Sequence, residues 1–198
     1  MDNEINEGRN GEQHTEPTPQ DEYVFSHCQT INILIDQRNY NEARNNLISL
    51  LDYHKKNNLH YPPLVNHLIR SLGLYPYIQT DTSEWHDRLV YDLFKVDVGL
   101  ANPITLHREQ SLILKRLLNG ENLAISAPTS FGKSFIIDAF ISLKKPNNVL
   151  IIVPTISLTD ETRRRLHRKF SAEYKIITTA DVEPSEKKHF CIPSRESY

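Results

Sequence analysis

The residues with the clearest chemical potential form one short run, Ala127-Pro-Thr-Ser-Phe-Gly-Lys-Ser134, between an apolar segment and a helix-like one. In that context, successive backbone N–H groups and the N-terminus of a helix form a cradle for an anion. Gly132 allows the backbone to approach a phosphate because it has no Cβ. Lys133 would place its charge on nucleotide phosphates, and Ser134 would offer its hydroxyl to Mg²⁺. The run predicts a phosphate-binding P-loop; a plain turn is the alternative.

The segments around this loop predict an α/β fold. From Thr105 onward, short apolar strands alternate with amphipathic helices, a pattern typical of a parallel sheet covered by helices. The predicted strands are 122–127, 149–153 and 174–178, and the predicted helices are 105–119, 133–143 and 157–170. The loop then lies between a strand and a helix, which is the position that phosphate binding requires.

The loop resembles motif I of superfamily 2 nucleic-acid helicases of the DEAD/DEAH-box kind. Ala127 followed by Pro-Thr matches that motif, whereas Ser130 stands where the family usually has Gly. Gln110 lies about where these helicases place a Gln that reads adenine; a bland helical Gln is the alternative. The resemblance implies ATP and Mg²⁺ as ligands, with Ser134 reaching the metal through the nucleotide. The implied ATP contacts are Gln110, Ala127, Thr129, Ser130, Phe131, Gly132, Lys133 and Ser134.

A second stretch, Val149–Leu158, resembles motif Ia of the same helicases. The resemblance implies that Pro154 and Thr155 contact the backbone of a bound DNA or RNA strand. Glu161 departs from the family, which usually has Gln at this place. The helix that follows is basic and could neutralise phosphates or simply be a solvated face. Its basic residues are Arg163, Arg164, Arg165, Arg168 and Lys169, of which Arg163 and Arg164 are the first candidates.

The resemblance also implies parts that this sequence does not contain. These helicases complete their ATPase site with an Asp-Glu pair at the end of an apolar strand and with a second RecA-like lobe. Here the two Asp-Glu pairs are Asp21-Glu22, in an acidic stretch, and Asp160-Glu161, on the basic helix. The sequence therefore predicts the N-terminal part of an ATP-dependent helicase, inactive alone. The alternative is a non-catalytic interaction or decoy protein that keeps a vestigial P-loop.

Three regions are expected along the chain. Residues 1–22 are polar and acidic and predict a disordered tail. Residues 23–101 predict a helical accessory segment, with helices at 24–37 and 41–56, another after Pro62-Pro63 and one from Asp81. Residues 102–198 predict a partial RecA-like lobe, so the fold class is α/β: a helical segment followed by an incomplete P-loop parallel sheet. The form of 126–134 and 160–166 is most similar to helicases of antiphage systems of the Hachiman kind.

Composition limits the class of protein. No apolar run approaches the roughly 20 residues that a membrane span needs, and the N-terminus has no apolar core like that of a secretory signal. Cys28 and Cys191 are far apart in sequence and predict free thiols. Seven of the 25 acidic residues but one of the 23 basic residues lie in 1–22, so the remainder is mildly basic. We therefore expect a cytoplasmic protein with no membrane partner, and the charge permits a nucleic-acid partner without requiring one. The helicase resemblance implies DNA or RNA as that partner, together with a missing C-terminal helicase portion or a defence protein.

Overall fold

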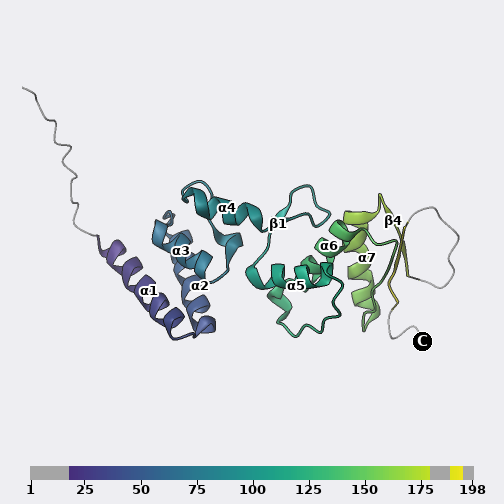
Figure 1. Cartoon of the computed structure of the whole chain (residues 1–198), viewed down its shortest axis with the longest axis horizontal. Helices are drawn as coiled ribbons and strands as arrows, with labels where there is room; N and C mark the ends of the chain where they lie inside the picture. The colour runs from purple at the N-terminus through teal and green to yellow at the C-terminus, as the bar shows by residue number, and fades with distance from the viewer. Residues whose placement is uncertain (1–17, 179–187, 194–198) are drawn as a thin grey trace, which may run out of the picture. The chain divides into compact units, whose positions relative to one another are not determined.

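The computed structural model describes residues 18–178 and 188–193 (Figure 1). The chain divides into two compact units, one up to Leu68 and one from Ile69 onward, named here the N-terminal and C-terminal units. The boundary expected between residues 101 and 102 falls inside the C-terminal unit. The reason is local pairing: strands β1 (Lys95–Val96) and β2 (Ile104–Thr105) form an antiparallel ladder across that point.

The N-terminal unit consists of helices. α1 (Pro19–Asp36) and α2 (Tyr40–Lys56) pack against each other, and α3 (Pro63–Ser71) begins in this unit. The helices expected at 24–37, at 41–56 and after Pro62-Pro63 are therefore present. The apolar residues buried in this unit come from all three helices: Cys28, Ile31, Ala43, Leu47, Leu50, Leu51, Val65 and Leu68.

Helix α1 begins inside the segment that was expected to be a disordered tail. Thr18 and Asp21 form a capping box, in which the Thr18 hydroxyl accepts from the Asp21 amide and the Asp21 carboxylate accepts from the Thr18 amide. Pro19 at the first helical position is already fixed near helical φ. These local groups satisfy the free donors of the first turn, so the expectation is wrong for residues 19–22. Residues 1–17 lie outside the described part of the chain.

The C-terminal unit opens with short elements that Arg108 holds together. The 3₁₀ turn η1 (Tyr75–Tyr77) and α4 (Trp85–Leu93) precede the β1–β2 ladder, and α5 (Arg108–Leu118) follows it. The Arg108 guanidinium donates to the carbonyls of Arg70 and Ser71 and to the Tyr75 hydroxyl. The Arg108 side chain, at the start of α5, thus connects residues 70 and 71 at the end of α3 to the unit that contains the P-loop.

A three-stranded parallel sheet follows these elements in the C-terminal unit. Its presence confirms the expected α/β fold class. Its strands are β3 (Asn148–Leu150), β4 (Tyr174–Ile177) and β5 (Lys188–Cys191), in the order β3-β5-β4. Phe190 of β5 stands opposite Val149 on one side and Ile176 on the other. The central strand is one that the sequence does not predict.

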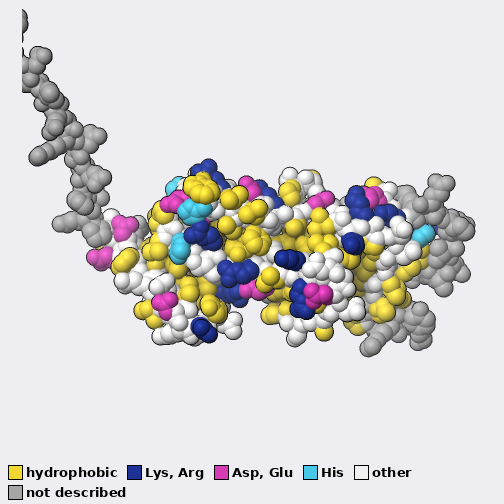
Figure 2. All heavy atoms as spheres, viewed as in Figure 1, with side chains coloured by type: hydrophobic (Ala, Val, Ile, Leu, Met, Phe, Trp, Pro, Cys, Tyr) yellow, Lys and Arg dark blue, Asp and Glu magenta, His cyan; other side chains and the backbone are white. Residues whose placement is uncertain are grey.

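The apolar segment 122–127, in contrast, is not a strand in this structure. A strand requires a hydrogen-bonded neighbouring strand. Within the described residues, β3 and β4 both pair with β5, and segment 122–127 pairs with none of them. The prediction of a strand at 122–127 is therefore corrected. Its Ile125 is exposed, as are Leu150 and Ile152 at and after the end of β3. Figure 2 shows hydrophobic side chains reaching the visible surface among the charged ones.

Helix α6 (Lys133–Lys144) lies between two hydrophobic cores and so fixes where the P-loop ends. Ile136 and Ala139 pack with Leu114 of α5 in one core. Ile141 packs in the other core, with residues of α7 (Ile156–Phe170) and of the sheet: Leu166, Phe170, Tyr174, Phe190 and Ile192. Because α6 packs into both cores, its first residue, Lys133, has a determined position relative to α5 and α7.

Among the described helices, none combines the length and the apolar character needed to cross a membrane.

Candidate nucleotide and nucleic-acid site

The loop before α6 has the glycine conformation and the following helix that its sequence predicts for phosphate binding, whereas the segment 122–127 that precedes it is not the predicted strand. A short 3₁₀ turn, η2 (Thr129–Phe131), leads to Gly132, and α6 starts at the next residue. Gly132 has φ +78°, in the left-handed region, and a Cβ built on it would lie 2.8 Å from Nε2 of Gln110. The left-handed conformation favours glycine here, and a side chain would also have to displace the Gln110 carboxamide.

Gln110 lies under this loop and connects it to α5. Its side chain is buried, its Nε2 donates to the Phe131 carbonyl over 2.7 Å, and its Oε1 accepts from the His107 amide over 2.9 Å. The second bond caps the first turn of α5. A carboxamide has two N–H groups and an oxygen with two acceptor sites, so each end of Gln110 retains capacity for one further bond.

The lysine of the loop is turned back onto the loop itself. Lys133 Nζ donates to the carbonyls of Ala127 and Pro128 at 2.6 and 2.8 Å. Ser134, Thr129 and Ser130 are exposed to solvent. A bound phosphate would therefore draw the Lys133 ammonium away from two carbonyls, and the Ser134 hydroxyl is accessible for Mg²⁺ on the nucleotide. Within the described residues, no group of three His, Cys, Asp or Glu is arranged to hold a metal ion.

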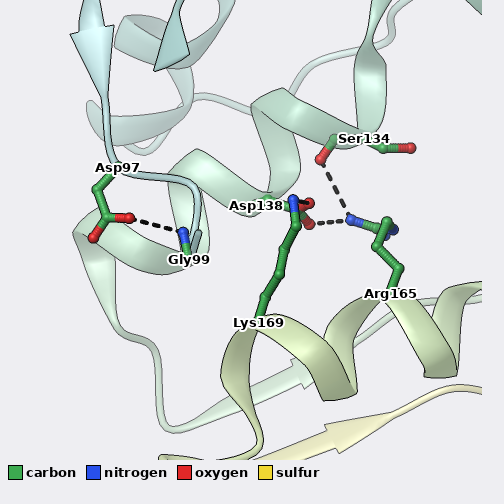
Figure 3. A network of polar contacts seen from close by, with 6 residues as sticks. All are labelled: Asp97, Gly99, Ser134, Asp138, Arg165 and Lys169. Atoms are coloured by element: carbon green, nitrogen blue, oxygen red, sulfur yellow. Dashed lines mark hydrogen bonds and ion pairs between the residues drawn. The ribbon is translucent and has the colours of Figure 1, made fainter. Parts of the chain in front are cut away.

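A buried ion-pair network behind the loop was missed by the sequence reading (Figure 3). Asp138, fully buried on α6, accepts from Arg165 and, over 2.7 Å, from Lys169 Nζ. Arg165 Nη1 also lies 3.5 Å from the Ser134 carbonyl. The network thus joins α7 to the first turn of α6.

A signal for this network does exist in the sequence. Asp138 is the one charged residue in the apolar run 135–143, so a helix that is buried on both faces must find it a cation. Arg165 and Lys169 are four residues apart, which places both on one face of α7. Only the packing of α7 against α6 shows that these two cations are the partners.

The basic residues of α7, which are expected to bind nucleic acid, therefore fall into a buried group and an exposed group. Arg165 and Lys169 point inward to Asp138, as Figure 3 shows, whereas the side chains of Arg163 and Arg164 are 44% and 71% exposed. Both exposed guanidinium groups lie near Asp160, at 3.3 and 3.6 Å. Exposed pairs of this kind are weak, so Arg163 and Arg164 remain accessible to phosphates.

Thr155 occupies the N-cap of α7. Its Oγ1 accepts from the Leu158 amide over 3.3 Å, and its extended backbone (φ −133°, ψ 156°) is typical of a capping residue. Pro154 precedes it on an exposed turn that follows β3. The start of a helix beside an exposed turn can bind an anionic backbone. The structure thus places Pro154 and Thr155 at the opposite end of α7 from Lys169.

Comparisons with known proteins match both parts of the chain. Residues 4–88 match the family described as the anti-bacteriophage protein B N-terminal domain, and residues 107–193 match the DEAD/DEAH box helicase family. Anti-bacteriophage protein B of Escherichia coli (strain K12) is 33% identical over 156 residues, which are 77% of this chain and 21% of that protein. Replication restart protein PriA of Haemophilus influenzae is 32% identical over 105 residues, 50% of this chain and 14% of that protein.

The chain therefore spans about a fifth or less of the length of these two relatives. Within that span, the match at 107–193 covers Gln110, the P-loop and the start of α7. The resemblance to DEAD/DEAH-box helicases is confirmed: a segment that matches that family follows a segment that matches the N-terminal domain of an anti-bacteriophage protein.

Proposed function

We propose that this chain supplies the ATP-binding segment of a helicase that acts in defence against bacteriophage. The observation that carries the proposal is the loop geometry: Gly132 in the left-handed conformation, followed at once by a helix that begins with Lys133 and Ser134. In this proposal the loop and Lys133 hold the phosphates and Ser134 holds Mg²⁺. The antiphage role rests on the similarity to anti-bacteriophage protein B.

The buried Gln110 supports adenine as the base. Its unused N–H and acceptor site match the N7 acceptor and the N6 amino donor of adenine. Guanine presents acceptors at both N7 and O6, so the Gln110 oxygen would face another acceptor. The same side chain that braces the Phe131 carbonyl would therefore also favour ATP over GTP.

Replacing Gln110 with Ala is expected to reduce the preference of the chain for ATP over GTP from about tenfold to near unity, because one good bidentate contact discriminates by about 1–3 kcal/mol. Calorimetric titration with each Mg-nucleotide measures the ratio. Gln29→Ala, on an exposed part of α1, is the control. The ratio of the ATP and GTP affinities is the informative quantity, because loss of the hydrogen bond to the Phe131 carbonyl weakens the binding of both nucleotides. An unchanged ratio would mean that Gln110 only braces the loop.

These 198 residues are expected to bind ATP without turning it over. Hydrolysis needs a carboxylate that positions Mg²⁺ and water. Asp21-Glu22 lies in the first turn of α1, and Asp160-Glu161 lies on α7, where Asp160 pairs with Arg163 and Arg164. A steady-state ATPase assay, with and without nucleic acid, should read background. Robust turnover by the pure chain would contradict this expectation.

The exposed arginines of α7 are the proposed contacts with a nucleic-acid backbone, together with Pro154 and Thr155. Changing both Arg163 and Arg164 to Ala should weaken binding and reduce the salt slope by about 1.4 for a single strand, or about 1.8 for duplex DNA, because each lost phosphate contact removes counterion release. Fluorescence anisotropy over a range of salt concentrations measures this slope. Lys115→Ala with Arg116→Ala, an adjacent exposed pair on α5, is the matched control. Equal slopes would assign Arg163 and Arg164 to a merely solvated face.

A further inference from the structure

Helix α1 of the N-terminal unit presents a long face that nothing else in the described part of this unit covers. Of its 18 residues, the two buried ones are Cys28 and Ile31. Phe25 is 56% exposed and Ile33 54% exposed, although both are large apolar side chains. Such a helix is attached along one side only, and the flank beside that side offers apolar surface to another molecule.

Two adjoining hollows run along this face. One, of about 590 Å³, lies between the first turns of α1, the end of α2 and the start of α3. The other, of about 440 Å³, continues along α1, and both are lined by Leu64 of α3. The α1 residues lining them include two rows spaced by four: Gln20, Val24, Cys28 and Asn32, and Asp21, Phe25, Gln29 and Ile33.

Rows at this spacing form ridges on the helix surface, and the ridges of a second helix pack into the grooves between them. Residues 20–33 span about 20 Å at the helical rise, which matches a partner helix of about 13 residues. A groove of this shape suits the recognition mode in which an amphipathic helix inserts apolar side chains at i, i+3, i+4 and i+7.

His54 gives the groove a polar point of recognition. It lines the larger hollow, its residue exposure is 1%, and within the described residues neither ring nitrogen makes a hydrogen bond of normal geometry, although backbone groups of His60 and Leu59 lie close to the ring. Its ring stacks edge-on against Tyr61, with centroids 5.2 Å apart. Burial lowers the pKa of His54, an effect that the nearby backbone of His60 and Leu59 opposes. A buried imidazole without partners is costly, and a ligand side chain that bonds to it would remove that cost.

The charges at the groove determine the sign of its partner. Asp21 and Glu22 stand at one end, and the residues lining the two hollows include no Lys or Arg. The hydrogen bonds from Thr18 lower the pKa of Asp21, which keeps its carboxylate ionised. An anionic partner, such as a nucleic acid or an acidic membrane surface, would be repelled. The same holds for residues 1–17 of this chain, which contain five acidic residues and one Arg.

We propose that the groove along α1, with His54 in it and Asp21 and Glu22 at its end, binds an amphipathic helix of a partner protein that carries Lys or Arg beside its apolar face. Apolar residues of that helix fill the hollows around Phe25 and Leu64. A polar group from it bonds to His54, and its basic residues meet the two carboxylates. This surface is separate from the P-loop site, so the proposal does not depend on ATP binding.

The probe is a phage-displayed library of random 16-residue peptides, selected on the full 198-residue chain. Enriched peptides should show the i, i+3, i+4, i+7 apolar pattern together with two or more Lys or Arg. A synthetic peptide from that set should become helical on binding. Its affinity should fall about tenfold or more in Phe25→Asp and in Glu22→Lys, since anchor and charge contacts at the centre of such interfaces dominate binding.

Matched controls separate the groove from general effects. Leu93→Asp places the same change on another exposed apolar side chain, and Glu161→Lys reverses an exposed charge on α7; both should leave the affinity unchanged. His54→Phe keeps an aromatic ring while removing both nitrogens. It should keep or raise the thermal stability of the chain and lower peptide affinity severalfold, a combination that a purely structural His54 would not produce.

Four outcomes would overturn the proposal. They are enrichment of acidic or patternless peptides, no enrichment, a dimer of the chain that Phe25→Asp dissociates, and peptide binding that appears only after residues 1–17 are deleted. The dimer would make the groove an interface between two copies of the chain. Peptide binding only after the deletion would make residues 1–17 the occupant of the groove.

Discussion

Replacing Asp138 with Ala should destabilise the C-terminal unit by about 3–5 kcal/mol, the usual cost of breaking a buried ion pair from one side. The side chains of Arg165 and Lys169 are 19% and 8% exposed, so both would keep their charge with little water and no carboxylate. The loss should be large relative to a total domain stability of about 5–15 kcal/mol. α7 should also loosen from the first turn of α6.

The matched control for this change is Asp160→Ala. Asp160 also pairs with two cations of α7, but all three side chains are exposed, and such pairs contribute about 0–1 kcal/mol. Urea titration followed by far-UV circular dichroism of the helices measures the free energy of unfolding, because Trp85, the one tryptophan of the sequence, is too exposed to report on it. Amide hydrogen exchange in α6 and α7 would locate the loss. Similar destabilisation by the two substitutions would show that burial of the Asp138 network contributes nothing.

Replacing Lys133 with Ala should lower the affinity for Mg·ATP by about 10- to 100-fold, because a hydrogen bond to a charged group contributes about 1.5–3 kcal/mol. The proposed nucleotide site predicts this effect, since Lys133 would exchange the Ala127 and Pro128 carbonyls for phosphate oxygens. Isothermal calorimetry on the folded chain measures it.

Lys144→Ala is the matched control for the lysine substitution. It removes the same charge from the opposite end of α6, where the side chain is exposed and far along the helix from the loop. Its ATP affinity should equal that of the unchanged chain. An unfolding midpoint for Lys133→Ala equal to that of the unchanged chain would exclude collapse of the loop as the cause. Equal ATP affinity in all three proteins would refute the phosphate role of Lys133 and favour a vestigial loop.

Local features were readable from the sequence. The helix after the P-loop is expected at 133–143 and observed as Lys133–Lys144, because its start depends on Gly132 and its course on apolar periodicity. The helix expected at 157–170 is observed as Ile156–Phe170 for the same reason. The α/β class follows equally from the alternation of segments, which needs no knowledge of which strands pair. The phosphate and nucleic-acid roles themselves remain predictions that the experiments above test.

Features that depend on distant partners required the tertiary structure. Strand β5 takes the central place, where its Phe190 is fully buried in the core with Leu166 and Phe170, and a short apolar run does not by itself show which strands it will pair with. Segment 122–127 reads as a strand yet pairs with none of the described strands, because pairing is a property of two segments. The inward turn of Arg165 and Lys169 follows from Asp138 on another helix, whereas sequence spacing places these two cations on one face of α7 without identifying their partner. Periodicity thus determined the helices, and long-range packing decided which strands pair and which charges stay available for a ligand.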